Sequence, residues 1–360
     1  MKILSYVNNY HKQRLKIYIK SYLNRKENGS RNISYLDLGI LNPAIGTSNL
    51  GDSIIFESVY RELRDLFDED LFTSFPTQIH TSYDAKYLMS QKDLLFVAGT
   101  NLLASNLEER MQWKLTPSHR RFLSNKVVLV GCGWWQYQEN PNNYTSKLYE
   151  RILNHNLIHS ARDSYTVKKL NSIGIENVLN TTCPTLWNIN PEFCSTISRI
   201  RKRNVITTLT FYNKNKSDDL EMLTMLSNHY ETVLLWVQGY EDIVYLNELN
   251  QNIRNIDIIP PTLEALDAAL SKGDCDYIGT RLHAGIRAIQ NGIRSLILAV
   301  DNRALEIGKD VNLNVIERAD VSEVKSFING EYETAIVLPE ENIRAFKASL
   351  KNYRSNSISK

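Results

Sequence analysis

A cation and a titratable imidazole stand close together in residues 276–289, "DYIGTRLHAGIRAI", where an apolar run gives way to a helical pattern. The first N–H groups of a helix are unpaired and carry a partial positive charge, so a strand-to-helix junction of this kind favours anions. Thr280 could cap the helix, and Arg281 could bind a phosphate or a carboxylate. His283 could act as a general acid or base, because imidazole titrates near neutral pH. A structural role, with Arg281 paired to a carboxylate and His283 buried, fits the same residues about equally well.

A glycine-rich loop at residues 46–55, "GTSNLGDSII", precedes the first predicted helix. Asn49 and Gly51 permit a tight approach of the backbone, and Asp52 could cap the helix. The loop lacks the glycine spacing of a dinucleotide fingerprint or a P-loop, so nucleotide binding is not indicated. A simple strand-to-helix turn with a capping residue is the competing interpretation.

Two further apolar runs end in small residues, at "VAGTNLL" (97–103) and "VGCGWWQYQ" (130–138). In parallel α/β sheets, ligands bind beyond the carboxyl ends of the strands, so the loops after these runs are candidates for a binding site. Trp134, Trp135 and Tyr137 could stack on the C–H face of a sugar ring. Packing in a core or an interface is an equally good interpretation for one of the two tryptophans.

The chain as a whole alternates short β-branched runs with helical segments, which predicts an α/β fold. The alternation occurs in two blocks around a polar stretch at residues 183–204, so we expect two doubly wound, Rossmann-like domains with parallel sheets and a cleft between them. We assign residues 33–190 to the first domain and residues 191–360 to the second, with a C-terminal helix and a flexible tail. Near the end of the first domain, Asp163 would cap a helix and Arg162 would brace the domain. The predicted strands cover residues 33–41, 93–99, 125–133, 157–163, 204–211, 231–239, 256–261, 275–280 and 293–301, and the predicted helices cover 52–67, 144–156, 164–174, 217–230, 241–253, 262–273, 281–292 and 339–354.

Length and composition are those of a soluble two-domain protein, with 360 residues, 42% hydrophobic and 23% charged. No apolar run approaches the ~18 residues of a membrane-spanning helix, and the N-terminal apolar stretch is too short and interrupted for a signal peptide. The four cysteines (Cys132, Cys183, Cys194 and Cys275) show neither metal-ligand spacing nor a disulfide framework. We therefore expect a cytoplasmic protein that holds no metal.

Residues 1–32 form a basic arm that contains five Lys, three Arg and one Glu. The net charge of the whole chain is only +2, so the other 328 residues sum to −5. Apolar side chains at Leu15, Ile19 and Tyr22 recur at helical spacing among the basic ones. Such a helix could dock against the protein with a solvated basic face, or lie on an anionic membrane surface. The acidic body and the lack of a recognised motif argue against nucleic acid as a partner.

The chain resembles the polysaccharide pyruvyl transferases in four segments that occur in the same order. These are cytoplasmic enzymes of cell-surface glycan assembly, with a two-domain fold like that of GT-B glycosyltransferases. The resemblance covers residues 35 to about 315, and the R-x-H element within "GTRLHAG" is its most specific part. The four segments are "N-x-G-D" (49–52), "ARDSYTVKKLNSIGIENV" (161–178), "GTRLHAGIRAIQNGI" (279–293) and "VDNRALEIGKDV" (300–311).

The resemblance implies that phosphoenolpyruvate donates a carboxyethylidene group to two hydroxyls of one sugar, which forms a cyclic ketal and releases phosphate. It implicates Arg281 and His283 in catalysis, with His283 as the acid that protonates the methylene carbon. Asp52 is the candidate base for the acceptor hydroxyl, and no cofactor or metal is required. The acceptor would belong to a capsule or exopolysaccharide, or to its lipid-linked precursor at the cytoplasmic membrane face. The expected donor-binding residues are Thr280, Arg281, Arg303 and Lys214, and the expected acceptor-binding residues are Asn49, Asn101, Trp134 and Trp135.

One strand departs from the family pattern. Relatives often carry a basic residue where the first strand of the second domain ends, whereas "NVITTLTFYNKNK" has Thr207, Thr208 and Thr210 there. Lys214 or Lys216 could replace the missing cation from the following loop. Anion binding by this strand is therefore the weakest part of the resemblance.

Two other classes of function fit parts of the sequence. A glycosyltransferase that uses a nucleotide-sugar would share the two-domain plan, and Glu323 and Glu331 have the E-x7-E spacing of some retaining enzymes. Two glutamates at this spacing also occur easily by coincidence. A non-catalytic scaffold for a glycan-assembly complex would tolerate the loss of Arg281 and His283, whereas either enzyme needs an organised cleft.

Overall fold

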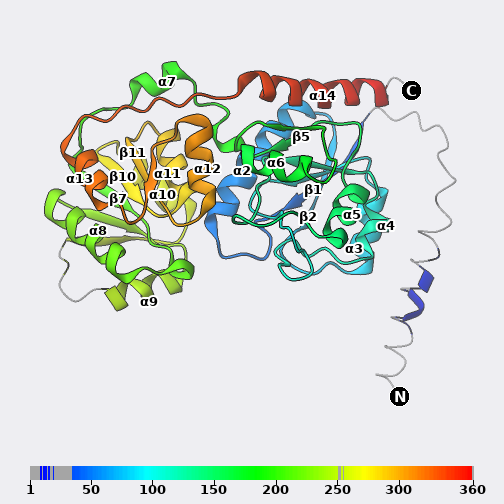
Figure 1. Ribbon diagram of the computed structural model, residues 1–360, viewed down its shortest axis with the longest axis horizontal. Helices are drawn as coiled ribbons and strands as arrows, with labels where there is room; N and C mark the ends of the chain where they lie inside the picture. Colours follow the sequence, from blue (N-terminus) through cyan, green and yellow to red (C-terminus); the bar gives the residue numbers. More distant parts are fainter. Residues whose placement is uncertain are drawn as a thin grey trace.

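Each half of the chain folds around its own parallel sheet, and the two halves lie next to each other along the long axis of the molecule (Figure 1). The structure is a computed structural model that describes residues 9, 11–13, 15, 16, 19, 35–249, 253 and 255–358. The predicted α/β fold with two doubly wound parallel domains is confirmed.

The first half contains a four-stranded parallel sheet in the order β2-β1-β3-β4. The parallel pair β5-β6 extends it, because a bridge from Cys132 to Ala161 joins the segment after β4 to β5. The strand order reverses between β1 and β3, so the loops after these strands diverge and leave a crevice. The strands are β1 (Asp37–Asn42), β2 (Leu71–Pro76), β3 (Leu95–Ala98), β4 (Val127–Val130), β5 (His159–Ala161) and β6 (Val178–Asn180), and the helices are α2 (Leu50–Leu66), α3 (Tyr83–Gln91), α4 (His119–Phe122), α5 (Asn143–Ile152) and α6 (Ser164–Asn171).

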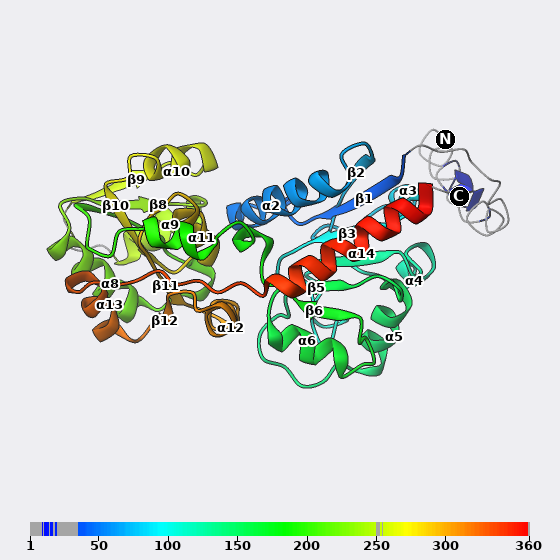
Figure 2. The same ribbon diagram turned by 90° about the horizontal axis from the view of Figure 1, so that it is seen from above.

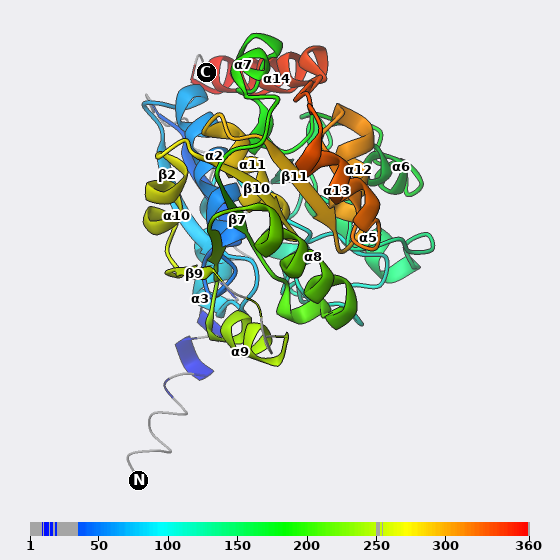
Figure 3. The same ribbon diagram turned by 90° about the vertical axis from the view of Figure 1, so that its left-hand side faces the viewer.

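The second half contains a six-stranded parallel sheet in the order β12-β11-β10-β7-β8-β9, which reverses between β7 and β10. Helices α8 and α13 pack together over one face of it (Figure 3). Helices α10, α11 and α12 contribute to the core on the other face. The elements are β7 (Asn204–Thr207), η3 (Phe211–Asn213), α8 (Lys216–His229), β8 (Val233–Trp236), α9 (Tyr240–Leu249), β9 (Ile256–Ile259), α10 (Leu263–Leu270), β10 (Cys275–Gly279), α11 (Leu282–Gln290), β11 (Ser295–Ala299), α12 (Asn302–Val311), β12 (Val315–Glu317) and α13 (Val321–Asn329).

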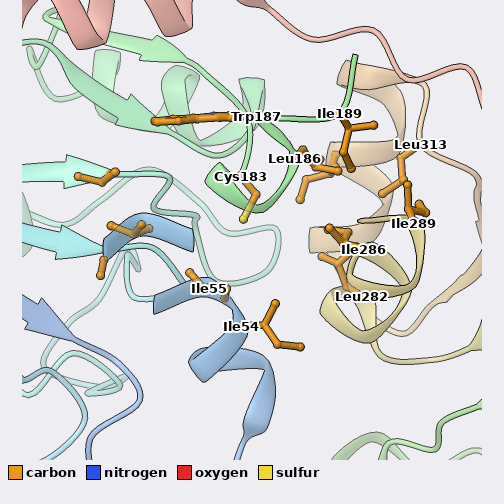
Figure 4. Packing of buried hydrophobic residues seen from close by; sticks show 14 of the residues in the cluster. Ile54, Ile55, Cys183, Leu186, Trp187, Ile189, Leu282, Ile286, Ile289 and Leu313 are labelled. Atoms are coloured by element: carbon orange, nitrogen blue, oxygen red, sulfur yellow. The ribbon is translucent and has the colours of Figure 1, made fainter. Parts of the chain in front are cut away.

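The segment between the halves is structured and forms an apolar seam with α2 and α11. It contains the short helices η2 (Pro184–Leu186) and α7 (Pro191–Thr196), and η2 contacts both α2 and α11. Ile54 of α2 faces Leu282 and Ile286 of α11 in this seam (Figure 4). One continuous cluster of buried apolar side chains therefore holds together the two helices that begin next to the predicted site.

The last helix, α14 (Glu340–Ile358), crosses back and lies along the first half (Figures 1 and 2). Phe346 of α14 packs edge-to-face on Trp187, with 6.0 Å between the ring centroids. Arg354 Nε donates a hydrogen bond to Asp70 at 2.6 Å. The chain therefore passes twice between the halves, once through η2 and once through the segment between α13 and α14 (Figures 1 and 2).

The C-terminal segment differs from the sequence-based expectation in two respects. We assigned residues 191–360 to the second domain and expected a flexible tail, but α14 packs on α2, β5 and β6 and stays helical to Ile358. The helical periodicity marks Ile343, Phe346 and Leu350 as one buried face. Periodicity does not show which half of the protein covers that face. The assignment of α14 to the second domain was therefore wrong.

Most of the basic arm (residues 1–32) lies outside the described residues, so the docked and membrane-bound interpretations both stay predictions. Its described residues are helical, and the side chains of Leu15 and Ile19 are exposed. In the part of the chain that the structure describes, no helix combines the length and apolarity needed to cross a membrane.

Replacing Phe346 by alanine should destabilise the protein, because its ring is fully buried between α14 and the first half. Lost burial and the cavity left behind should lower the free energy of unfolding by about 3–5 kcal/mol. Urea denaturation followed by circular dichroism measures this change. K351A, at an exposed position of the same helix, should change it by less than about 0.5 kcal/mol. Equal stability of the two variants would show that α14 contributes nothing to the core.

Candidate active site

A narrow pocket lies where the two reversal points of the sheets face each other across the seam. Its walls come from the loop between β1 and α2 and from the loops after β7, β8, β10 and β11. These are the carboxyl ends of the strands, where doubly wound folds bind ligands. The narrow pocket is lined by Asn49, Gly51, Asp52, Tyr212, Gln238, Thr280, Arg281, Leu282, His283, Val300, Asp301, Arg303 and Ala304.

Arg281 lines the narrow pocket, but its charge is already paired. Its Nη2 donates to Asp242 Oδ1 at 3.1 Å, and its Nε donates to the carbonyl of Leu209 at 2.9 Å. The guanidinium also lies 4.9 Å from the ring centroid of Tyr212, and only 6% of the residue is exposed. The carboxylate partner of the structural interpretation is therefore present, while one side of Arg281 still borders the pocket.

Helix α11 begins without a side-chain cap. Arg281 occupies the N-cap position and makes no capping hydrogen bond with its side chain. Thr280, the predicted cap, instead donates to the carbonyl of Thr208 at 3.1 Å and lies 2.8 Å from the hydroxyl of Thr210. This prediction was wrong because the Thr280 hydroxyl forms its hydrogen bonds with the loop after β7 and not with the helix N–H groups. The first N–H groups of α11 are thus left for a ligand in the described structure.

His283 lies in the first turn of α11, and its Nε2 is 3.6 Å from Cys183 Sγ. Burial lowers the pKa of His283 to about 3, and the charges of Arg303 and Arg162 act in the same direction. In the absence of a bound anion, the imidazole is therefore neutral at pH 7.

Arg303 and Asp301 form an ion pair in the wall that follows β11. Arg303 Nε donates to both carboxylate oxygens of Asp301 at 2.9 Å, and Nη2 donates to the hydroxyl of Tyr212 at 3.3 Å. Asp301 also caps α12, since it accepts a hydrogen bond from the backbone N–H of Arg303. Although burial opposes it, the charge of Arg303 holds the pKa of Asp301 below its usual value. The beginnings of two helices, α11 and α12, thus border the same narrow pocket.

Asp52 is buried at the start of α2 and faces the pocket. It is not the helix cap as predicted, because Asn49 occupies that position and accepts from the Gly51 N–H at 3.2 Å. The Asp52 carboxylate accepts from Thr100 at 2.8 Å and from Gln78 at 2.9 Å. Burial raises the pKa of Asp52 in spite of these hydrogen bonds. A carboxylate in this condition is a better proton acceptor than an exposed one.

A wider cleft of about 930 Å³ opens from the narrow pocket along the first half. The two spaces share Asn49, Asp52, Tyr212, Asp301 and Arg303, so they are continuous. A cleft of this volume is in the range of ligand sites for small molecules. The cleft is further lined by Thr47, Gln78, Asn101, Glu109, Arg110, Met111, Gln112, Lys114, Trp135, Gln136 and Asn213.

The two neighbouring tryptophans lie in different surroundings, one in the cleft and the other in the core. Trp135 lines the cleft, and the Arg110 guanidinium lies 4.1 Å from its ring centroid. Trp134 has no exposed surface, packs edge-to-face on Tyr149 and donates from Nε1 to Gln138. The prediction that Trp134 contacts the acceptor was therefore wrong, because this side chain belongs to the core.

The charged candidates of the second half are not all near the pocket. Lys214 donates to Glu248 at 2.8 Å and lines neither the narrow pocket nor the cleft, so its predicted donor-binding role is not supported by its position. Lys216 pairs with the same glutamate at 3.0 Å. Glu323 and Glu331 are exposed and also line neither space. Among the described residues, no group of three or more His, Cys, Asp or Glu is arranged to hold a metal ion.

Three residues near the pocket were missed or assigned differently from the sequence. Arg162 is buried, donates to Asn101 at 3.0 Å and to Asp163 at 3.1 Å, and has no partner for Nη1 in the described structure. It therefore braces the domain as expected, but also acts on the pKa of the pocket histidine. Asp242 and Tyr212 carry no sequence signal that sets them apart from other loop residues.

Solved structures share the overall arrangement of this chain. The UDP-GlcNAc 2-epimerase of Methanocaldococcus jannaschii, in complex with UDP-GlcNAc and UDP, has a TM-score of 0.50 at 13% identity, over 89% of this chain and 99% of that chain. The Neisseria meningitidis UDP-GlcNAc 2-epimerase has a TM-score of 0.44 at 12% identity (90% and 99%), and the lipopolysaccharide outer core galactosyltransferase WaaB has 0.44 at 9% (90% and 99%). At such identities the likeness concerns the fold alone, which is of the GT-B type.

A family model matches the greater part of the sequence. No curated protein is significantly similar to the chain in sequence. The profile of the family described as polysaccharide pyruvyl transferase matches residues 49–302, more than two thirds of the chain. The matched region contains Asp52, Arg281 and His283, and Arg303 follows it directly. The chain therefore belongs to the polysaccharide pyruvyl transferase family.

Proposed function

We propose that the protein transfers a carboxyethylidene group from phosphoenolpyruvate to two hydroxyls of one sugar in a cell-surface polysaccharide or its lipid-linked precursor. The observation that carries this proposal is the narrow pocket, which joins two helix beginnings, two arginines and a buried histidine, and opens into a cleft large enough for a sugar. The narrow pocket has a volume of only about 30 Å³, so the small, highly charged donor would lie at its mouth, where it joins the cleft, and the sugar acceptor would lie in the cleft of about 930 Å³.

The donor is a compact anion whose phosphate and carboxylate are attached to the same carbon. The first N–H groups of α11 would hold its oxygens, together with Arg303 and Arg281, whereas Asp301 already caps the start of α12. Both arginines keep their aspartate partners, so backbone N–H groups carry much of the binding. Thr208 and Thr210 stand where relatives often have a basic residue, and their hydroxyls hold the loop after β10 rather than a charge. This chain would thus bind the donor with fewer free cations than its relatives.

The reaction adds one proton to the donor and removes two from the acceptor. His283 would give a proton to the methylene carbon, which leaves a cation at the neighbouring carbon. One sugar hydroxyl then bonds to that carbon, the bond from this carbon to the phosphate oxygen breaks, and a second hydroxyl closes the ketal. Asp52 would take a hydroxyl proton at the junction of pocket and cleft, and the departing phosphate takes the other. The proton taken by Asp52 returns to His283 through solvent, so atoms and charges balance with inorganic phosphate as the only by-product.

The neutral state of His283 makes protonation depend on the donor. Arg303 and Arg162 both lower the pKa of this imidazole. A phosphate and a carboxylate bound beside them would offset those charges and raise the pKa. His283 would therefore become an effective acid only when the donor is in place.

The proposal also concerns where the reaction occurs. Phosphoenolpyruvate is an intracellular metabolite, so the reaction would take place in the cytoplasm. A lipid-linked acceptor would bring the protein to the inner face of the membrane, where the basic arm at residues 1–32 could contact anionic headgroups.

Purified protein with phosphoenolpyruvate and a panel of glycosides should release inorganic phosphate and form a product heavier by one carboxyethylidene group. H283N should lower the rate by about 10²–10⁴-fold, the usual contribution of a general acid. R303A should lower it as well, whereas R303K should keep part of the activity because the cation is retained. K309A on the exposed side of α12 is the matched control and should keep the full rate. Turnover of a nucleotide-sugar with none of phosphoenolpyruvate would contradict the proposal.

Burial of a neutral His283 should also make the protein less stable in mild acid. Below its ordinary pKa of about 6.5, the unfolded chain binds a proton that the folded imidazole, with a pKa of about 3, does not accept. Stability should therefore fall as the pH decreases from 7 to 5, and H283Q should remove about 2 kcal/mol of that decrease. Urea denaturation at both pH values measures it. H155Q, at an exposed histidine, should keep the wild-type decrease, and an unchanged decrease in H283Q would show that the imidazole is not held neutral.

A further inference from the structure

One part of the cleft lies beyond the narrow pocket and has its own charge pattern. We call it the outer cleft and define it by Glu109, Arg110, Gln112, Lys114 and Trp135, which line the cleft and not the narrow pocket. The first four come from the segment between β3 and α4, and the fifth from the loop after β4. The reaction described above uses none of them except Trp135 as a surface for the sugar.

Arg110 is the central side chain of the outer cleft. Its Cζ lies over the Trp135 ring, 4.1 Å from the ring centroid, and Nη2 donates to Gln112 at 3.1 Å. Its Nε is buried and has no hydrogen-bond partner among the described residues. No carboxylate of the described chain forms an ion pair with it. Partial burial lowers the pKa of Arg110, which is the expected sign of a cation taken from water without a counter-ion.

The other arginines of the site, unlike Arg110, form ion pairs with aspartates. Arg281 is paired with Asp242, and Arg303 is paired with Asp301. Arg110 stands on an aromatic face that orients it toward the cleft instead. Lys114 adds a second cation to the outer cleft, and it too has no ion-pair partner within the described part of the chain. Arg110 and Lys114 therefore leave an excess of positive charge where only one carboxylate is present.

That carboxylate does not neutralise the pair. Glu109 is exposed and accepts a hydrogen bond from Asn106 at 3.2 Å. A buried donor without an acceptor costs free energy unless a ligand or water supplies one. A planar guanidinium fixed by stacking is well suited to two parallel hydrogen bonds with a carboxylate or a phosphate.

We propose that the outer cleft binds an anionic group, a carboxylate or a phosphate, that belongs to the sugar acceptor. Arg110 makes the principal contact, Lys114 adds charge, and Trp135 holds the guanidinium in place and borders the attached sugar. The acceptor is then an acidic or phosphorylated saccharide, with its anionic group away from the hydroxyls that react at Asp52. This assignment rests on the proposed function, since it names the class of acceptor for that reaction.

Calorimetric titration of the full-length protein tests the anion site without the reaction. Three probes carry the same ring in different charge states: methyl galactoside is neutral, galacturonate carries a carboxylate, and galactose 1-phosphate carries a phosphate. At least one anionic probe should bind more tightly than the neutral one, and added salt should weaken it. R110Q should reduce that binding by about tenfold to hundredfold, R110K by less, and binding of methyl galactoside should not change. R120Q, at an exposed arginine of α4, is the matched control and should bind like the wild type.

The two anionic probes identify the source of the charge. Preference for galacturonate would indicate an acidic sugar, and preference for galactose 1-phosphate would indicate a phosphorylated acceptor. Equal affinity for all three probes, or anion binding that survives in R110Q, would overturn the assignment. Phosphoenolpyruvate is titrated in parallel: failure of the wild type to bind it would refute the proposed donor but leave an Arg110-dependent anion site standing. Equal turnover of neutral and anionic acceptors would refute the anion site but leave the proposed reaction standing.

Discussion

The buried ion pair between Arg281 and Asp242 ties together three loops on which the candidate site depends. Arg281 follows β10, Asp242 lies at the start of α9 after β8, and the carbonyl of Leu209 that accepts from Arg281 follows β7. Threonine hydroxyls already join the loops after β7 and β10, where the strand order reverses, and the ion pair adds the loop after β8 to them. Loss of either partner would leave an uncompensated buried charge, which costs about 3–5 kcal/mol. The narrow pocket exists because this pair closes one side of the crevice and leaves the start of α11 open on the other.

The position of the first half is set by a different kind of contact. Apolar side chains of α2, η2 and α11 form one seam, and the segment that leads to α14 crosses between the halves a second time (Figure 2). Helix α2 begins with the buried Asp52, and α11 begins next to His283. Packing along these helices therefore fixes how far the proposed base stands from the proposed acid. Apolar packing places the two chemical groups, and hydrogen bonds then set their protonation.

The sequence was informative about elements with strong local signals. Every predicted strand and helix has a counterpart, and Asp163 caps α6 as expected, accepting from the Thr166 N–H at 2.7 Å. Strand β2 was missed because it lies at the edge of its sheet and is only partly buried, so it lacks an apolar run. Helix α12 was missed because Gly308 interrupts its pattern, although the close approach of Val315 explains a glycine there.

Site residues could be predicted where a chemically suitable residue follows the end of a predicted strand. They could not be predicted where a partner far away in the sequence determines the position of the side chain. Eight of the ten predicted site residues line the narrow pocket or the cleft: Asn49, Asp52, Asn101, Trp135, Thr280, Arg281, His283 and Arg303. Lys214 does not, because Glu248 of another helix holds its ammonium group. Trp134 does not, because adjacent side chains point to opposite sides and the sequence does not say which one faces the core. Arg110 was missed, because its interest depends on the lack of an ion-pair partner among the described residues, which only the three-dimensional structure reveals.

The charges of the site fall into two kinds, and this division constrains the proposed chemistry. In the narrow pocket each arginine has its aspartate, so the walls are close to neutral and anion binding relies on the oriented N–H groups at the uncapped start of α11. Dipoles of this kind act at short range and favour a small anion placed at the start of the helix. They would not draw in a large polyanionic saccharide. The outer cleft has uncompensated cations instead, and charge of that kind acts over a longer distance. The short-range dipoles would therefore favour the donor at the narrow pocket, and the longer-range charges would favour the acceptor in the outer cleft. Only the donor would reach His283, whose protonation it enables.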